Sequence, residues 1–397
     1  MDIDNWEVYE IKTSSISAEI EAGKLKVVKS YQEMAYAVRV IVNGRVGFAS
    51  ASSLEEAKKM AVKLAKVSEE KLKDFPVEKP RVVKGIYDKR FENLDANYLK
   101  SEVEVILSSA DRANIAFANV EHELTEVRIT NSFGLDCSEK STYSSLIVEA
   151  VYDTGSSYEM YESRGIKLDI EDTTKRAEEL AIKSSKAEKI DSGYYDVVLK
   201  PLAVHQLFYY TLYPSLSAEN VYRGRSRLRI GDYIGKITVL DDSTIEGGLF
   251  SCSFDDEGVA ARKTVLVEDG VVKSYYTDWK YSKLMDINPT ANGFREDYSS
   301  PPSPSPSNIL IEIDEKADDD NALIVYSFIG AHTSNPVSGD FSLECMNAEL
   351  NGKAVKGAMV YGNVFEILKR IEGKCDRVRQ VENTITASVR FSKLRIV

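Results

Sequence analysis

The stretch VRVIVNGRVGFAS, residues 38–50, carries the strongest local fold signal in this chain. Two runs rich in apolar and β-branched residues, 35–42 and 45–50, flank the pair Asn43-Gly44. Asn-Gly suits the two-residue turn of a β-hairpin because both turn positions need positive φ angles. The stretch therefore predicts an antiparallel hairpin.

Further strands and helices are expected on both sides of this hairpin. Three segments have helical spacing of apolar residues: one that begins with a capping box of Ser53 and Glu56, one over 98–116 and one over 171–190. Strand-like runs occur at 6–11, 14–22, 24–31, 127–130, 144–151 and 158–161. Because strand often follows strand directly, we expect mainly antiparallel pairing.

The pattern changes after Asp191-Ser192-Gly193, where we place a domain boundary. Beyond it one helix is expected near 202–212, after Pro201 in a position suited to a first helical turn. The other segments read as short strands at 237–241, 259–268, 271–277, 309–313 and 323–328. The Ser/Pro stretch 299–307 predicts a solvated loop or an extended, polyproline-like segment, since proline cannot donate to a sheet.

A chain of 397 residues favours two domains. We expect an α+β fold of mostly antiparallel sheets with flanking helices. Residues 1–190 would form an N-terminal domain with three helices, and residues 191–397 a β-rich C-terminal domain.

The composition disfavours several classes of function. A net charge of −12 argues against a nucleic-acid surface, which needs clustered lysine and arginine. No run approaches the roughly 18 apolar residues of a membrane span. The acidic start Met1–Glu7 lacks a secretory pattern, and the four scattered cysteines show no metal-binding spacing. We expect a cytoplasmic protein with reduced thiols.

One run, HQLFYY at residues 205–210, invites comparison with a zinc peptidase. A catalytic zinc has three protein ligands, and a carboxylate takes a proton from the bound water. Here Gln206 is an uncharged amide, and Tyr209 and Tyr210 are protonated phenols at neutral pH. An ordinary core histidine is therefore the favoured interpretation of His205, with a metal role as the alternative.

Two other clusters have a simple structural interpretation. Asp255, Asp256 and Glu257 are adjacent, so they suit a turn with a salt bridge better than a cation site. Ser338-Gly339-Asp340 suits a tight turn, because glycine adopts backbone angles that other residues resist. The nearby serines and His332 have no G-x-S-x-G motif, which argues against a serine hydrolase.

Arginines occupy every second position of VYRGRSRLRI, residues 221–230. In an extended segment they would share one strand face and form a positive stripe. A solvated face or internal ion pairs would explain them. Alternatively, Arg225 and Arg227 would contact an acidic surface of a partner chain.

Three stretches together resemble the TldD/PmbA family. They are VRVIVNGRVGFAS at 38–50, FDDEGVAARKTVLVEDG at 254–270, and SNPVSGDFS at 334–342, the last being similar to the PmbA (TldE) branch. Their order and spacing fit nearly the whole chain. The resemblance implies a subunit of a cytoplasmic metallopeptidase that is built from two related chains and degrades unstructured peptides.

The resemblance also implies which chain of the pair this is. In the family, the TldD-like chain carries HExxxH on a helix and a cysteine near its C-terminus. If His205 takes the first position, Gln206 and Tyr210 stand where Glu and the second His would be, and residues 376–393 contain no cysteine. No cofactor is then expected on this chain, and zinc is expected on the TldD-like partner.

We therefore expect a non-catalytic subunit that is active in proteolysis only with its partner. The candidate groove or partner-facing residues belong to the PmbA-branch motif and its surroundings: His332, Ser338, Gly339, Asp340, Phe341 and Ser342. The alternative is a homodimeric, non-enzymatic peptide-binding or scaffolding protein with a lost active site. The family's older label, modulator of DNA gyrase, implies no DNA binding here.

Overall fold

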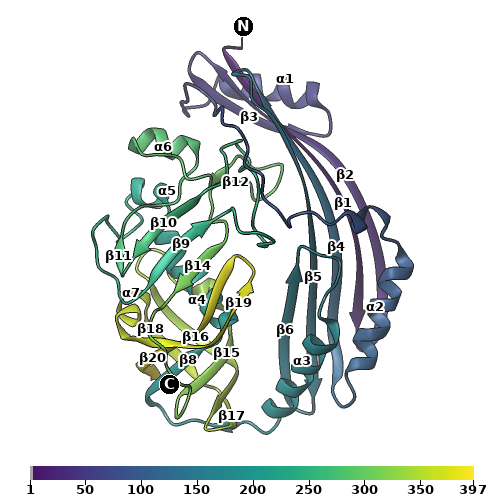
Figure 1. The fold of residues 1–397 in the computed structure, drawn as a ribbon, viewed down its shortest axis with the longest axis vertical. Coiled ribbons are helices and arrows are strands. Elements are labelled where there is room, and N and C mark those ends of the chain that lie inside the picture. Colours follow the sequence, from purple (N-terminus) through teal and green to yellow (C-terminus); the bar gives the residue numbers. More distant parts are fainter. Residues whose placement is uncertain (1–2) are drawn as a thin grey trace.

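Two large β-sheets organise the protein, whose computed structural model describes residues 3–397 (Figure 1). Met1 and Asp2, at the start of the acidic N-terminal stretch, lie outside the described residues. The N-terminal sheet has six antiparallel strands in the order β3-β2-β1-β4-β5-β6. The C-terminal sheet has twelve strands and only three parallel pairings. The predicted α+β fold of mostly antiparallel sheets is confirmed.

The N-terminal sheet is built from long strands. Its turn at Asn43 and Gly44, with φ angles of 51° and 72°, confirms the predicted hairpin. The separate strands predicted at 6–11 and 14–22 are in fact one strand, because Thr13 pairs on both sides, with Glu33 and Thr125. The six strands are β1 (Asn5–Glu21), β2 (Lys24–Val42), β3 (Arg45–Ala51), β4 (Asn114–Asn131), β5 (Asp136–Tyr152) and β6 (Gly155–Ser163).

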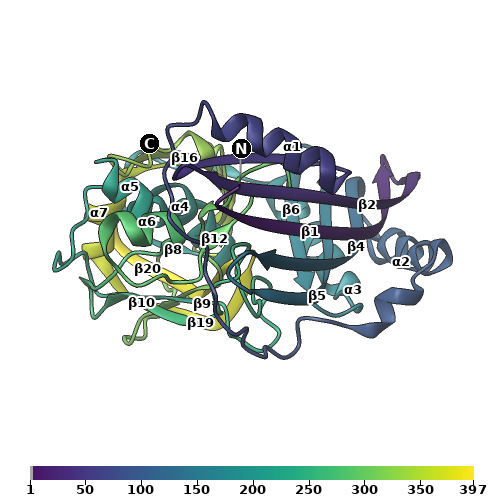
Figure 2. The same ribbon diagram turned by 90° about the horizontal axis from the view of Figure 1, so that it is seen from above.

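Three helices cover one face of this sheet. They are α1 (Leu54–Ala65), α2 (Ala96–Ser109) and α3 (Ile170–Ser184). Alternate residues such as Val120 and Leu146 face α2 and α3 and form an apolar core with them. The C-terminal part of the chain lies on the opposite side of the sheet from α1 and α2 (Figures 1 and 2). One face of the sheet therefore lies in an apolar core with the helices, and the residues on the other face, toward the C-terminal part, need not be apolar.

Three details of these helices differ from the prediction. The helix predicted over 171–190 ends at Ser184, because Glu188 and Lys189 already pair with a strand of the C-terminal sheet. Ser53 is the N-cap residue of α1, but its side chain makes no capping hydrogen bond, so the predicted capping box is wrong. The helix predicted over 98–116 ends at Ser109, because residues from Asn114 onward pair with β5. Its N-terminus is instead capped by Asp95, which accepts from the backbone N–H groups of Asn97 and Tyr98.

The C-terminal sheet surrounds helix α4 (Pro201–Ser215), the helix predicted near 202–212. α4 packs against β15 and β20 in the largest apolar core of the protein. The strands are β7 (Glu188–Lys189), β8 (Gly193–Leu199), β9 (Thr238–Asp242), β10 (Lys263–Glu268), β11 (Val271–Val272), β14 (Ile309–Glu312), β15 (Leu323–Ile329), β16 (Asp340–Leu350), β17 (Lys353–Lys356), β18 (Met359–Asn363), β19 (Ile371–Val381) and β20 (Thr384–Ile396).

Short elements complete this part of the chain, and the prediction of a single helix in it is wrong, because three short helices follow α4. They include the helices α5 (Ala218–Tyr222), α6 (Trp279–Met285) and α7 (Val364–Ile367), and the paired strands β12 (Gly293–Phe294) and β13 (Ser303–Pro304). Three 3₁₀ turns are η1 (Lys89–Asn93), η2 (Ala331–Thr333) and η3 (Leu368–Arg370). Among residues 3–397, no helix has the length and apolarity to cross a membrane.

The Ser/Pro stretch 299–307 is less solvated than predicted. Ser303 and Pro304 form β13, and Ser307 is fully buried. Ser307 donates from both its backbone N–H and its hydroxyl to the buried carboxylate of Asp241. Because the Ser307 hydroxyl donates to a buried carboxylate, this end of the stretch lies in the protein interior.

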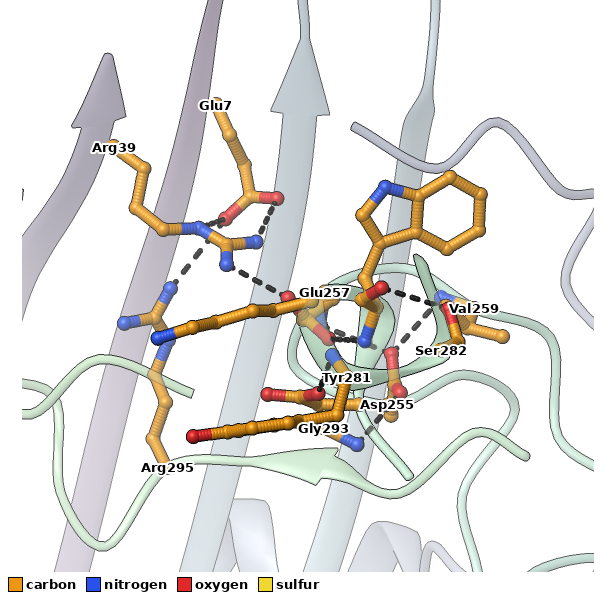
Figure 3. A network of polar contacts seen from close by, with 12 residues as sticks. Glu7, Arg39, Asp255, Glu257, Val259, Tyr281, Ser282, Gly293 and Arg295 are labelled. Carbon is orange, nitrogen blue, oxygen red and sulfur yellow. Dashed lines mark hydrogen bonds and ion pairs between the residues drawn. The ribbon is translucent and has the colours of Figure 1, made fainter. Parts of the chain in front are cut away.

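A buried ion-pair network joins the N-terminal sheet to turns of the C-terminal part of the chain (Figure 3). Arg39 on β2 donates to both carboxylate oxygens of Glu7 on β1, at 2.9 and 2.6 Å, and to Glu257 at 2.7 Å. Arg295 lies 3.5 Å from Glu7. Asp255 accepts the backbone N–H groups of Glu257, Val259 and Gly293. The predicted turn with a salt bridge is therefore what the structure shows at residues 255–258.

Candidate functional site

A cavity of about 540 Å³ lies between the N-terminal sheet and the C-terminal part of the chain. Its floor comes from β1, β4 and β5, and its other walls from α4, the β19–β20 turn and irregular segments. The lining residues are Tyr9, Glu123, Thr125, Val127, Glu139, Ser141, Tyr143, Arg164, Tyr209, Leu249, Phe250, Ser251, Cys252, Phe254, Asp256, Phe294, Arg295, Ser305, Pro306, Ser307, Glu382 and Asn383.

The floor of the cavity is polar because of the pleat of the sheet. Every second residue of a strand points to the same face, and the apolar residues of β4 and β5 already face the helices. The remaining residues pair across the two strands as Glu123 with Tyr143, Thr125 with Ser141, and Val127 with Glu139. The sheet thus presents two carboxylates and three hydroxyl groups to the cavity.

His205 lies directly behind the cavity wall. Its Nδ1 is 2.9 Å from the Thr384 hydroxyl, and its Nε2 is 3.3 Å from a carboxylate oxygen of Glu382, a lining residue. Thr384 is in turn 2.7 Å from the Tyr213 hydroxyl. A neutral imidazole satisfies this chain when Nε2 donates to Glu382 and Nδ1 accepts from Thr384. The hydrogen bond from His205 lowers the pKa of the Glu382 carboxyl against the opposing effect of burial.

The side chains around His205 do not fit a catalytic zinc. Both imidazole nitrogens have protein partners, and the Gln206 amide oxygen accepts the Phe328 backbone N–H at 2.6 Å. Tyr210 packs edge-on toward His332. Within residues 3–397, no three His, Cys, Asp or Glu side chains gather in a way suited to a metal ion. The four cysteines are unpaired thiols.

The PmbA-branch motif follows η2 and leads into β16, and most of its residues are exposed or half-buried. Gly339 has a φ of 80°, and Ser338 and Asn363 hydrogen-bond the Asp340 carboxylate at 2.7 and 2.8 Å. These bonds lower the pKa of Asp340, with the one from Asn363 as the larger cause. His332, Asp340 and Ser342 are exposed, whereas Gly339 and Phe341 are buried. The predicted tight turn is present, and a role of its residues in a groove or interface stays a prediction.

The predicted arginine stripe is present only in part. Residues 218–222 form α5, so Arg223 follows a helix, and residues 225–229 belong to no regular strand, yet the exposed Arg225, Arg227 and Arg229 alternate there with buried Ser226 and Leu228. Arg223 pairs with Glu219 on α5 at 2.8 Å. Arg227 donates to the Ser338 carbonyl at 3.2 Å and lies over the Phe365 ring. The structure thereby brings the arginine segment into contact with the PmbA-branch motif, two regions that the sequence suggested separately.

Several residues that line the cavity were not predicted from the sequence. Glu123 and Glu139 belong to strands whose other face is apolar, so the alternation of Glu121, Glu123 and Thr125 along β4 was the available signal. Glu382 gave no local signal, since it stands in a turn. His122 lies on the opposite, helix-covered face, 2.7 Å from both Ser144 and Glu102, and belongs to the core.

Comparisons with known proteins cover the whole described fold. The family models of PmbA/TldA metallopeptidase domain 1, central domain and C-terminal domain match residues 6–65, 50–185 and 192–397. An uncharacterized protein of Methanocaldococcus jannaschii is 36% identical over 97% of this chain and 94% of its own length. A metalloprotease of Methanothermobacter thermautotrophicus is 27% identical over 91% of this chain and 85% of its own length.

Two solved structures share the fold. TldE from Thermococcus kodakarensis superposes with a TM-score of 0.92, at 23% identity, over 100% of this chain and 97% of that one. A protein from Thermotoga maritima that is described as a modulator of a DNA gyrase gives a TM-score of 0.89, at 24% identity, over 99% and 96% of the two chains. At these identities the likeness concerns the fold alone.

Proposed function

Because this chain belongs to the TldD/PmbA family of metallopeptidases, we propose that it is the non-catalytic subunit of a cytoplasmic peptidase. A related TldD-like chain supplies the zinc and the general base. The present chain holds the extended peptide substrate in the cavity between its two sheets.

The surroundings of His205 carry the first half of this proposal. A catalytic zinc needs three protein ligands, and its bound water needs a proton acceptor. Here His205 is held between Thr384 and Glu382, and the Gln206 amide oxygen already accepts a backbone N–H. These contacts give α4 a packing role. His205 and Gln206 therefore hold α4 in place at the cavity wall, where Glu382 and Tyr209 can contact a bound peptide.

The size and lining of the cavity support the second part of the proposal, that this chain holds the peptide substrate. Ligand sites typically measure roughly 300–1,000 Å³ and combine apolar walls with a few placed polar groups. This one, at about 540 Å³, has aromatic walls and a floor of carboxylates and hydroxyls. The four free thiols suit a reducing compartment such as the cytoplasm.

The deciding experiment compares this chain alone, a TldD-like chain with intact HExxxH alone, and the two chains co-expressed. We expect stoichiometric zinc in the preparations that contain the TldD-like chain, and cleavage of an unfolded peptide only by the co-purified pair. Stoichiometric zinc or robust cleavage by the present chain alone would overturn the proposal. If the chains do not associate and this chain forms homodimers that bind peptide, the non-enzymatic alternative replaces it.

A further inference from the structure

The charge on the cavity walls is unbalanced. Four carboxylates line the cavity, those of Glu123, Glu139, Asp256 and Glu382, against two guanidinium groups. Glu123, Glu139 and Asp256 form no ion pair with a lysine or arginine in the described part of the chain. Burial raises the pKa of the Glu139 and Asp256 carboxyls, which means that their charged forms lack full compensation.

The two guanidinium groups are committed to other partners. Arg164 donates to three backbone carbonyls, those of Thr142, Gly248 and Ser251, and so ties the N-terminal sheet to the C-terminal part. Arg295 pairs with Glu7, outside the cavity, and donates to the Ser300 carbonyl. Neither arginine forms an ion pair with Glu123 or Glu139, although the nearby charge of Arg164 offsets part of the effect of burial on the pKa of the Glu139 carboxyl.

Aromatic rings surround these carboxylates. Tyr209 and Phe250 are 39% and 40% exposed although they line the cavity, and Tyr143 stands beside Glu123 on the floor. The faces of aromatic rings attract cations, and an ammonium or guanidinium group that also meets a carboxylate is held by both. Tyr9, Phe254 and Phe294 complete the ring of aromatic residues.

One buried polar atom also lacks a partner at the cavity. Nε of Arg295 has no hydrogen-bond acceptor, and the side chain is 2% exposed. A buried donor without an acceptor is costly, and because this atom exposes less than 1 Å², a carbonyl oxygen in the cavity relieves that cost only if the Arg295 side chain turns toward it. A ligand that matches this wall has a cationic group for the carboxylates and a carbonyl group for Arg295.

We propose that the cavity selects peptides by a lysine or arginine side chain, which enters between the carboxylates of Glu123, Glu139 and Glu382 and the rings of Tyr143, Tyr209 and Phe250. The inference rests on the proposed peptide-holding function and specifies its substrate class. The peptide backbone next to that side chain supplies the carbonyl for Arg295. Neutral and acidic side chains leave the floor carboxylates uncompensated and are held less tightly.

The test measures binding of short, unstructured, fluorescent peptides with blocked termini to the full-length chain. One peptide has a single central lysine, a second has acetyl-lysine at that place, and a third has glutamate. We expect the lysine peptide to bind at least about tenfold more tightly than the acetyl-lysine peptide, the effect of one partly desolvated charge pair. The glutamate peptide should bind most weakly, and added salt should reduce the preference for lysine.

Two variants locate the effect. The double variant Glu123→Gln/Glu139→Gln keeps the shape and the acceptor oxygens that hold Thr125 and Ser253. It should bind the lysine and acetyl-lysine peptides almost equally. Glu126→Gln, on the same strand but not in the cavity lining, is the matched control and should keep the preference.

The outcomes separate this inference from the proposed function. Equal binding of the lysine and acetyl-lysine peptides to the unmodified chain overturns the selection of cations and leaves peptide holding intact. An unchanged preference in the double variant also overturns it, because the cation then binds elsewhere. Failure of all three peptides to bind contradicts the peptide-holding function itself, and with it the inference.

Discussion

Arg39 and Glu257 are separated by 218 residues in the sequence, yet their side chains meet at 2.7 Å between the two sheets. Both side chains are nearly inaccessible to solvent, at 7% and 1% exposed. Glu257 also accepts the backbone N–H of Trp279 at the start of α6. A single carboxylate thus connects a strand of the N-terminal sheet, a turn and a helix of the C-terminal part.

Removing that carboxylate should destabilise the whole protein. Glu257→Gln removes one charged hydrogen bond of the Arg39 guanidinium, which keeps Glu7 as its counter-charge, and such bonds contribute about 1.5–3 kcal/mol. Asp136→Asn is the control, since Asp136 pairs with Arg128 on the surface and such pairs contribute roughly 0–1 kcal/mol. Denaturation with urea measures both. Equal losses in the two variants would show that the buried pair has no special role.

A second prediction concerns pH, through Asp278 at the N-cap of α6. Burial, followed by the nearby Glu257 charge, raises the pKa of Asp278 from 3.8 to about 8. In the unfolded chain this carboxyl ionises near pH ~4. The folded state therefore binds the extra proton between these values, and the free energy of unfolding falls as pH rises through that window.

Asp278→Asn tests this sign without loss of the cap. Asparagine still accepts the Tyr281 backbone N–H, which Asp278 accepts at 2.7 Å, and asparagine is as good an N-cap as aspartate. Between about pH 5 and pH 8 the free energy of unfolding of the variant should fall less than that of the unmodified chain, because asparagine does not titrate. The difference in slope should reach at most ~1.4 kcal/mol per pH unit. Parallel curves of unfolding free energy against pH would contradict the raised pKa.

Local sequence signals predicted the parts of this fold that local physics determines. The turn at Asn43-Gly44 has positive φ angles at both positions, and few residue pairs tolerate this. Helix α4 follows Pro201 as expected, since proline fits the first turn of a helix. These features depend on residues within one or two turns of each other.

Features that depend on distant residues were not predictable in the same way. β1 continues through polar Thr13 because strands on both sides pair with it, and that pairing is set by residues about 20 and 112 positions away. The period of two predicted an extended arginine segment, but Arg223 pairs with Glu219 of the short helix α5, and only residues 225–229 alternate between exposed and buried positions. The cavity depends on the meeting of both sheets, so Glu139 and Glu382 could not be associated from the sequence.

The position of His205 leads to a third prediction. His205→Ala removes the side chain between Thr384 and Glu382, and it should lower the free energy of unfolding by about 1–3 kcal/mol because buried polar groups lose a partner. The pKa of Glu382 should rise toward its ordinary value, since the hydrogen bond from His205 is the main cause of its lowering. Carboxyl NMR titration measures this.

Thr384→Val is the matched control for that titration. It removes the Nδ1 contact and leaves the contact of Nε2 with Glu382, so the Glu382 pKa should stay low while stability falls. If His205→Ala leaves the pKa of Glu382 unchanged, the hydrogen bond inferred between these two residues does not form in solution.

A fourth prediction concerns the turn of the PmbA-branch motif. A Cβ at Gly339 would lie 2.7 Å from a ring carbon of Phe365, in addition to the cost of a φ of 80°. Gly339→Ala should therefore destabilise the protein by more than the roughly 1 kcal/mol expected from backbone conformation alone. Gly134→Ala, at a φ of 97° with open space around it, provides that baseline. Equal shifts in melting temperature would mean that Phe365 yields to the added methyl group.

The last prediction joins the arginine segment to the partner chain. Arg225 and Arg227 are both exposed, and Arg227 contacts the Ser338 carbonyl of the PmbA-branch motif. If this surface meets an acidic region of the TldD-like subunit, Arg225→Glu/Arg227→Glu should replace attraction by repulsion and reduce co-purification about tenfold or more. Arg128→Glu, on the N-terminal sheet, changes the net charge by half as much at an unrelated place and should leave association nearly unchanged. Because Arg227 also lies over Phe365, the single variant Arg225→Glu separates the interface from folding. If both arginine variants co-elute with the partner as the unmodified chain does, these arginines do not contact the partner.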